Sequence, residues 1–365
     1  MSNDALFKPF NHPKLTLKNR VLMAPMTRQF SPDGVPGANV VDYYRRRAEG
    51  GVGLIITEGT TINHKAASFE SKIPNFYSDD ALAGWAKVVE AVHQAGGKIA
   101  PQLWHIGCAR KPGTGPFPDY PSATPSGMAL PGKQTGEPLT TGEIAQIVKA
   151  FADAAGDAKR IGFDAVEIHG AHGYLVDNFL WEGLNQRDDK YGGSRAKRSQ
   201  FAVEIVQAIR AQVGEEFPII FRFSQWKQQD YNARLANTPD ELLEILQPIS
   251  EAGVDIFHCS TRRFWEPEFA GSDLNLAGWT RKLLNKQTIT VGSVSLNEEF
   301  IATFKGGEAK GVDISELLRR LEANEFDLVA VGRALIANPD WVQLMQSGRH
   351  DELKTYDRAI LAELI

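Results

Sequence analysis

The feature that most constrains the fold is a recurring unit: a helical pattern, a glycine, a short apolar strand and then polar residues. Clear examples are Gly96 before residues 98–102, Gly162 before 164–169 and Gly253 before 254–258. Glycine supplies the left-handed turn that ends a helix, and short apolar strands without alternation are typical of a parallel sheet buried on both faces. The repetition therefore predicts right-handed βαβ units.

Strand candidates recur along the whole chain, at residues 20–24, 53–57, 98–103, 164–168, 218–223, 254–258, 287–291 and 327–331. Three residue pairs have the capping-box spacing that marks the N-terminus of a helix: Thr140 with Glu143, Thr238 with Glu241 and Ser295 with Glu298. These βα units predict an α/β protein, a (β/α)₈ TIM barrel forming a single domain over residues 1–365. A doubly wound open sheet is the alternative. The Gly- and Pro-rich segment 105–139 predicts a long loop after strand three that covers the barrel mouth.

Composition and charge limit the kinds of binding partner and the cellular compartment that we expect. The formal net charge of -5 gives no sign of nucleic-acid binding, and the basic run 45–47 is interpreted as a solvated helix face. Two cysteines, Cys108 and Cys259, cannot form a disulfide scaffold, so we expect reduced thiols. Residues 1–14 do not resemble a signal peptide, and no apolar run approaches the roughly 18 residues that span a bilayer. We expect a cytoplasmic protein with no membrane partner; the oligomeric state stays open.

The C-terminal ends of barrel strands carry the chemistry in this architecture. Strand seven ends in Gly292 and Ser293, and strand eight ends in Gly332 and Arg333 shortly before a helical pattern. Glycines let backbone N–H groups approach a phosphate closely, and a helix N-terminus favours an anion. These strand ends therefore predict a phosphate site, with two tight turns and a surface arginine as the alternative.

Strands three and five also end in polar residues. Arg222 lies between two phenylalanines, and a buried guanidinium needs an anionic partner, either a ligand or a structural carboxylate. Gln102 offers donors and an acceptor, which suits an amide-rich ring.

Strand four ends in His169 and His172, with Tyr174 two residues further on. Two histidines three residues apart could ligate a metal, but the spacing offers no third ligand, so we expect no metal. The imidazoles can hold a carbonyl or nitro oxygen, and tyrosine, with a reference pKa of about 10, stays a proton donor at physiological pH. Histidines with only local hydrogen bonds at the edge of the core are the alternative.

These segments resemble the motifs of the Old Yellow Enzyme ene-reductases. The matching stretches, in family order, are residues 22–27, 57–59, 102–107, 169–175, 185–194 and 331–333. Arg198 and Phe201 follow the 185–194 stretch at the spacing seen in the family. Each motif alone is weak, but together they run from about residue 5 to 345 and are highly specific.

The resemblance implies non-covalent FMN at the barrel mouth, with NADPH or NADH as the reductant. It implies contacts to the ring from Pro25, Met26, Thr27, Gly59, Gln102 and Arg222, and contacts to the phosphate from Gly292, Ser293, Gly332 and Arg333. It further implies that His169 and His172 bind the substrate oxygen and that Tyr174 delivers a proton. Hydride from flavin N5 would then reduce the activated C=C bond of an α,β-unsaturated carbonyl or nitro compound.

Some segments depart from the family pattern. Residues 224–230 stand where a proline-containing loop is expected, Trp181-Glu182 replaces a Ser-Pro-like pair, and Cys108-Ala109 stands where an arginine is common. The loop 261–265 is bulky and basic. Its Phe264 and Trp265 are candidate substrate-binding residues, with packing of the loop itself as the alternative.

Two other functions stay open. One is a single-domain flavin-dependent amine N-demethylase or dehydrogenase; with two cysteines and an end at Ile365, we do not expect a multi-domain relative with a cysteine cluster. The other is a non-catalytic FMN-binding redox sensor, which the presence of His169, His172 and Tyr174 disfavours.

Overall fold

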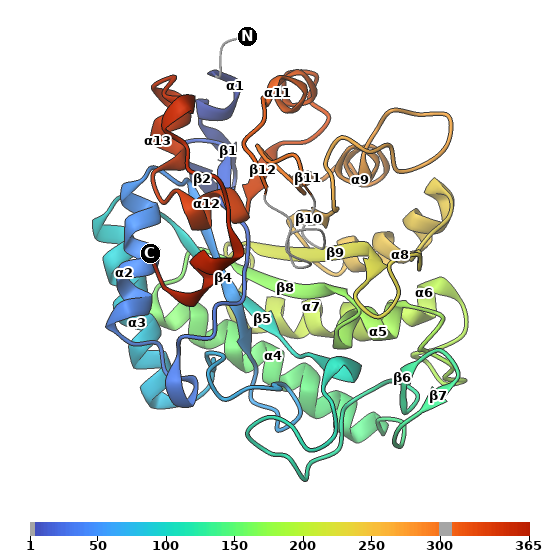
Figure 1. Cartoon of the computed structure of the whole chain (residues 1–365). Helices are drawn as coiled ribbons and strands as arrows, with labels where there is room; N and C mark the ends of the chain where they lie inside the picture. The colour runs from blue at the N-terminus through green and yellow to red at the C-terminus, as the bar shows by residue number, and fades with distance from the viewer. Residues whose placement is uncertain (1–3, 299–308) are drawn as a thin grey trace.

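The computed structural model describes residues 4–298 and 309–365, and within them eight parallel strands close into a barrel surrounded by helices (Figure 1). The barrel strands are β3 (Val21–Met23), β4 (Leu54–Thr61), β5 (Ile99–Trp104), β8 (Val166–His172), β9 (Ile219–Lys227), β10 (Ile256–Ser260), β11 (Gln287–Val291) and β12 (Leu328–Val331). Each predicted strand overlaps an observed one. The (β/α)₈ barrel is therefore confirmed, and the open sheet is wrong.

One short helix precedes the barrel, and the other described helices lie between or after the barrel strands. The helices are α1 (Asp4–Phe7), α2 (Ala38–Glu49), α3 (Asp79–Gln94), α4 (Thr141–Ile161), α5 (Leu175–Leu180), α6 (Arg195–Arg198), α7 (Gln200–Val213), α8 (Pro239–Glu251), α9 (Leu276–Leu284), α11 (Ser315–Glu322), α12 (Arg333–Ala337) and α13 (Trp341–Gln346). Short 3₁₀ turns occur at Pro32–Gly34, Gly107–Ala109, His350–Glu352 and Arg358–Ala362. Whether residues 1–365 act as a single domain stays a prediction.

The predicted helix boundaries follow from local chemistry. Gly96, Gly162 and Gly253 have φ of 72°, 99° and 121°, the left-handed region predicted for them. The capping box at Thr140 is complete. At Thr238 the side chain accepts from the backbone of Glu241, but the Glu241 carboxylate bonds to the backbone of Asn237 instead. The helix predicted after Ser295 falls largely on residues 299–308, outside the described residues.

The barrel interior is built from alternate strand positions. Its apolar part comprises Leu22, Ala24, Leu54, Ile56, Ala100, Ala165, Ile220, Ile256, Ile289, Val291, Leu328 and Ala330. The antiparallel hairpin β1 (Phe10–His12) and β2 (Leu15–Leu17) adds Phe10, Leu15 and Leu17 to this cluster. An interior filled by apolar side chains is a packed core and not a pore, so the polar inward positions higher on the strands form the site.

The long loop predicted over residues 105–139 is present and contains a hairpin that was not predicted. Strands β6 (Met128–Leu130) and β7 (Lys133–Gln134) pair at the edge of the molecule (Figure 1). The buried Arg110 organises the loop by donating to the carbonyls of Thr114, Phe117 and Tyr120. The start of the loop lies over the C-terminal end of β8, since Cys108 Sγ contacts the carbonyl of Gly173, whereas the hairpin packs beside the segment after α5.

The solvated-face interpretation of residues 45–47 is wrong for Arg47. Its side chain is fully buried and donates to the carbonyls of Tyr43, Leu335, Ile336 and Ile365. The guanidinium also lies 3.7 Å from the centre of the Tyr43 ring. A run of three arginines on a helix points to different sides, and only the tertiary contacts of α2 decide which one is buried.

Both cysteines are free, as the composition led us to expect, and the structure shows that both are buried. Among the described residues, no helix combines the length and apolar character that crossing a bilayer requires.

Candidate active site

Three side chains from β8 and the turn after it meet at the C-terminal end of the barrel. The backbone of β8 changes direction near its C-terminal end. Its register against β9 shifts between Gly170 and His172, and His172 has a φ of 66°. The ring centre of His169 lies 4.8 Å from that of Tyr174 and 5.1 Å from that of His172, both edge-to-face. The structure therefore brings together the three residues that the sequence singled out for catalysis.

Burial keeps these groups neutral. It is the main cause that lowers the pKa of His169 and of His172 well below the ordinary value, and the nearby Arg222 acts in the same direction. Burial raises the pKa of Tyr174 to about 12. A neutral imidazole keeps one N–H donor, and a neutral phenol keeps its proton. The cluster can therefore donate hydrogen bonds and a proton at neutral pH.

A serine at the end of β10 joins His172 to the arginine of β9. Ser260 Oγ lies 2.8 Å from His172 Nε2 and accepts from Arg222 Nη2 at 3.3 Å. With its Nε2 engaged, His172 has Nδ1 left for a ligand. The Nε atom of Arg222 is buried without a hydrogen-bond partner among the described residues. Burial lowers the pKa of Arg222, and the nearby Glu167 carboxylate acts in the opposite direction. The unpaired N–H can donate to a further anionic or polar ligand atom.

A chain of buried polar groups crosses the barrel below this cluster. The Glu167 carboxylate accepts from Gln102 Nε2 at 2.8 Å and lies 2.6 Å from His258 Nδ1. Sequence patterns had singled out Gln102 but not Glu167 or His258. Strand alternation could have found both, since Glu167 lies two residues before His169, and His258 two before Ser260, on the inward face.

The segment after β3 presents side chains that are only partly covered. Within residues 25–27, Pro25 and Met26 are half-buried and Thr27 is exposed. The Glu58 carboxylate holds this segment by accepting from the backbone N–H groups of Arg28 at 2.9 Å and Gln29 at 3.2 Å. Burial raises the pKa of Glu58 to about 7. The predicted ring-binding segment is thus fixed in place with one face open.

Glycines allow other elements to approach this face closely. A Cβ on Gly59 would lie 2.7 Å from the ring of Trp104, and a Cβ on Gly332 would lie 3.4 Å from Met26 Sδ. A side chain at either position would therefore fill space beside the predicted ring site.

The predicted phosphate residues also come together, at the ends of β11 and β12. Arg333 Nη2 donates to Ser293 Oγ at 3.3 Å. Gly292 has a φ of 136°, and a Cβ there would lie 2.6 Å from the carbonyl oxygen of Thr261. Only glycine fits this turn without strain.

Among the described residues, no ring contact joins Phe264 or Trp265 to the histidine–tyrosine cluster. Their rings contact each other edge-to-face with centres 5.1 Å apart, and the Phe264 N–H donates to the carbonyl of Gly292 at 3.1 Å. Phe264 is buried in the main apolar core. Packing of the loop thus accounts for Phe264, and a substrate-binding role for the pair stays a prediction.

Two other tryptophans contact the cluster. The ring centre of Trp104 lies 5.0 Å from that of Tyr174, and the ring of Trp226 stacks on His172 at 4.5 Å. Trp226 belongs to the unusual segment 224–230 and was not predicted as a site residue. It follows Arg222 and Ser224 at alternate positions of β9, so the same period of two could have placed it at the mouth.

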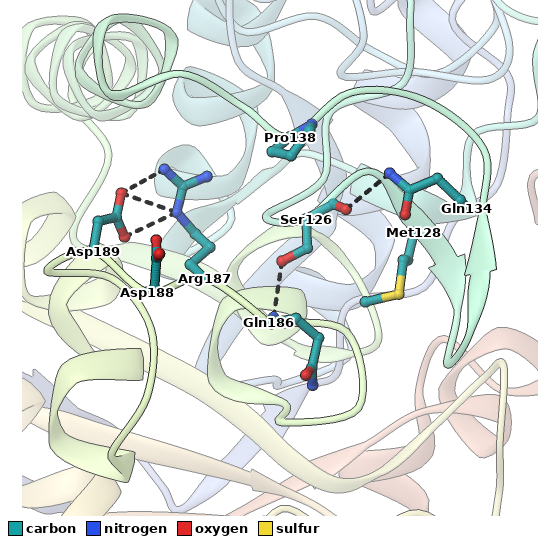
Figure 2. A pocket seen from close by; sticks show the side chains of 8 residues that line it. All are labelled: Ser126, Met128, Gln134, Pro138, Gln186, Arg187, Asp188 and Asp189. Atoms are coloured by element: carbon teal, nitrogen blue, oxygen red, sulfur yellow. Dashed lines mark hydrogen bonds and ion pairs between the residues drawn. The ribbon is translucent and has the colours of Figure 1, made fainter.

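A separate cavity of about 350 Å³ lies outside this site (Figure 2). Its lining residues are Ser126, Met128, Gln134, Pro138, Gln186, Arg187, Asp188 and Asp189. Figure 2 shows Arg187 paired with Asp189 and Ser126 bonded to Gln186 and Gln134. Arg187 also donates to the carbonyls of Pro125 and Leu139. These polar groups hold the long loop in place, so the cavity is a structural depression. In the described residues, no group of three or more His, Cys, Asp or Glu is placed to hold a metal.

Comparisons with known proteins agree with the fold. A family model described as the NADH:flavin oxidoreductase / NADH oxidase family matches residues 5–352. The chain is 36% identical over 351 residues to an NADH oxidase of Thermoanaerobacter brockii, covering 93% of this chain but only 50% of that protein. It is 32% identical over 358 residues to 12-oxophytodienoate reductase 7 of Oryza sativa subsp. japonica, covering 93% of this chain and 86% of that one. A solved structure of morphinone reductase in complex with tetrahydroNAD superposes with a TM-score of 0.82 at 31% identity, covering 98% of this chain and 93% of that chain.

Proposed function

The chain belongs to the NADH:flavin oxidoreductase / NADH oxidase family, and on that premise we propose that it reduces the activated C=C bond of α,β-unsaturated carbonyl or nitro compounds. It is an FMN-dependent oxidoreductase that takes its electrons from NAD(P)H. The observation that carries the proposal is the meeting of His169, His172 and Tyr174 beside the buried Arg222. Two relatives are named as reductases of 12-oxophytodienoate and morphinone, which supports a carbonyl-bearing substrate.

The residues present fit FMN. The unpaired Nε of Arg222 offers a donor and a positive charge for the polar edge of the flavin ring. The open face of residues 25–27 and the nearby Gly59 and Gln102 suit the ring itself. Gly292, Ser293, Gly332 and Arg333 suit the phosphate, because glycine turns and a fixed cation favour an anion. When bound there, FMN would supply the hydride-transfer chemistry between NAD(P)H and the substrate.

The histidine pair binds and orients the substrate oxygen. Both imidazoles are neutral, since burial lowers the pKa of each. The backbone N–H of Ala171 points at His169 Nδ1 at 3.4 Å, which favours hydrogen on Nε2. Preorganised N–H donors stabilise the negative charge that develops on the oxygen as the double bond is reduced.

Tyr174 holds the proton for the other carbon of the double bond. Its pKa, raised to about 12 by burial, keeps the phenol protonated well above neutral pH. Its ring lies edge-to-face to those of His169 and Trp104, which fixes the plane of the ring and the position of its oxygen. The group is therefore a proton donor of fixed position, supplied by the chain itself.

The test is the pair of half-reactions followed separately by stopped-flow absorbance, with NADPH as reductant and 2-cyclohexenone as oxidant. For Tyr174→Phe we expect the reoxidation of the reduced flavin by the enone to slow by about 10²–10⁴-fold, which is the usual contribution of a general acid. Reduction by NADPH should change little. In the unmodified enzyme, the enone step should show no loss of rate from tyrosine ionisation up to about pH 10, since the pKa of Tyr174 is raised to about 12.

Tyr191→Phe is the matched control, because this hydroxyl donates to Glu204 on α7 and lies outside the site. Equal slowing of both half-reactions by Tyr174→Phe would contradict the proton-donor role. Turnover of methylated amines without turnover of the enone would replace the proposed activity with an amine dehydrogenase.

A further inference from the structure

Strand β9 continues beyond its neighbour β10 on one side of the barrel mouth. Its last pair with β10 is Ser224 with Ser260, yet the strand runs on to Lys227 and pairs there with His172 of β8. We call residues 225–229 the β9 extension. It belongs to the segment 224–230, which departs from the family pattern, and it contacts the histidine–tyrosine cluster.

The β9 extension contacts two of the three catalytic candidates. Trp226 stacks on the ring of His172 with centres 4.5 Å apart and an interplanar angle of 24°. Gln228 Nε2 donates to the phenol oxygen of Tyr174 at 2.7 Å. Because the amide hydrogen occupies a lone pair of the phenol oxygen, the O–H of Tyr174 is free to point at a substrate.

The β9 extension is locked to the turn that carries Tyr174. Lys227 Nζ and Asp177 Oδ1 form a fully buried ion pair at 2.6 Å, and Asp177 Oδ2 accepts from the Gly173 N–H at 2.7 Å. Gln229 Nε2 donates to the Gly173 carbonyl at 2.8 Å. Gly173 has a φ of 78°, and a Cβ there would collide with the Gln229 side chain. The position of Gln228 relative to Tyr174 is thus set by buried contacts on both sides.

An N–H donor to the phenol oxygen has a chemical consequence as well as a geometric one. When Tyr174 gives up its proton, its oxygen becomes negative, and a hydrogen bond to a charged atom is stronger than one to a neutral atom. The Gln228 amide therefore stabilises the product side of the proton transfer more than the reactant side, which accelerates the step.

We propose that Gln228 is a positioning residue that holds the Tyr174 hydroxyl toward the substrate and supports the negative oxygen left after proton transfer. This inference rests on the proposed function, because it takes Tyr174 as the proton donor. It assigns a role to a segment that the flavin and substrate-oxygen contacts leave unexplained.

The first measurement is the rate of the enone half-reaction in Gln228→Ala. We expect a decrease of about tenfold, the effect of removing one hydrogen bond to a charged group, with NADPH reduction unchanged. Gln228 is exposed, so the fold should tolerate the change. In the background of Tyr174→Phe, Gln228→Ala should have no further effect, because Gln228 acts through the missing hydroxyl. An additive loss in the double variant would overturn the proposal.

The second measurement is the pH profile of Gln228→Glu. An ionised carboxylate cannot donate and would instead accept the Tyr174 proton, whereas a protonated carboxyl can donate as the amide does. We expect the enone step to slow as pH rises through the titration of the new carboxyl, from about pH 4.5 upward. A purely structural role gives no such dependence, and a profile parallel to that of the parent enzyme would count against the proposal.

A third readout does not depend on turnover. In holoenzyme carrying 3-fluorotyrosine in place of Tyr174, the ¹⁹F resonance reports ionisation of the phenol. Gln228→Ala should raise its pKa by roughly half a unit to one unit, since the charged oxygen loses a donor. Gln247→Ala, an exposed glutamine on α8 that bonds Glu251, is the matched control and should leave the resonance unchanged.

The outcomes separate the two proposals. If Tyr174→Phe does not slow the enone step, the proposed function fails. If Tyr174→Phe slows the step but Gln228→Ala changes neither the rate nor the ¹⁹F titration, the role of Gln228 alone is refuted.

Discussion

At the scale of single residues, backbone freedom matters as much as side-chain chemistry. Gly292 combines a φ of 136° with the carbonyl oxygen of Thr261 in the space that a Cβ would occupy. Any larger residue must move the end of β11, and with it the neighbouring Ser293 and Arg333.

Gly292→Ala is therefore expected to weaken FMN binding by about tenfold or more, since backbone strain of this kind costs about 1–3 kcal/mol. The measurement is the dissociation constant of FMN from the reconstituted protein. Gly142→Ala is the control, because a Cβ there meets nothing closer than Thr140 Oγ1 at 3.9 Å. Unchanged FMN affinity in Gly292→Ala would remove this turn from the phosphate site.

At the scale of elements, the turn between β8 and α5 and the end of β9 form one unit. Its centre is the ion pair of Lys227 with Asp177, both with fully buried side chains. Burial lowers the pKa of Lys227 and raises that of Asp177, while their mutual attraction acts in the opposite direction on each. Each charge of such a buried pair is stabilised by the other, so removing one residue leaves the charge of the other buried without a counter-charge.

Lys227→Met should destabilise the fold by about 3–5 kcal/mol, because Asp177 stays buried without its cation. The change in the free energy of unfolding can be measured by urea denaturation. Lys190→Met, which removes an exposed partner of Glu204, should cost at most about 1 kcal/mol. Adding Asp177→Asn to Lys227→Met should recover part of the loss. Equal stability of the two single variants would show that the buried pair is not anchoring the turn.

At the scale of the whole molecule, burial of neutral histidines links stability to pH. Burial is the main cause that lowers the pKa values of six histidines. The pKa of His64 is lowered to about 4, those of His105, His169 and His172 lie well below the ordinary value, and those of His12 and His258 lie below it. Below about pH 6.5 the unfolded chain binds protons that the folded chain does not, so stability falls as pH decreases. Glu58, whose pKa burial raises to about 7, acts in the opposite direction, as do Asp177, Glu268 and Asp327, whose pKa values burial also raises.

The melting temperature should therefore be several degrees lower at pH 5 than at pH 7.5. Each such histidine contributes up to about 1.4 kcal/mol per pH unit below its unfolded pKa. Thermal unfolding followed by circular dichroism at constant ionic strength is the measurement. A melting temperature at pH 5 equal to or above that at pH 7.5 would contradict the prediction that the neutral buried histidines dominate the dependence of stability on pH.

The fold class was predictable from the sequence because it follows from local rules. Glycine at helix ends, short apolar strands and their spacing identify each βα unit without knowledge of distant contacts. The family match over residues 5–352 confirms the resemblance stated from the motifs. The C-terminal ends of the strands were less predictable. Strands β4, β8 and β9 extend beyond their predicted apolar segments into polar residues, because a strand that lines a site carries polar side chains there.

The sequence by itself determined the barrel and the identity of the residues that follow each strand, because strand order brings the C-terminal ends together at one mouth. Only the tertiary structure decided which polar side chains share that mouth with His169 and Tyr174. Trp226 and Gln228 contact the histidine–tyrosine cluster because β9 extends beyond its last pair with β10. The buried ion pair of Lys227 with Asp177 holds this end of β9 in place. Arg47 likewise became a core residue through contacts more than 280 positions away. Such pairings depend on distances between elements, which no local pattern encodes.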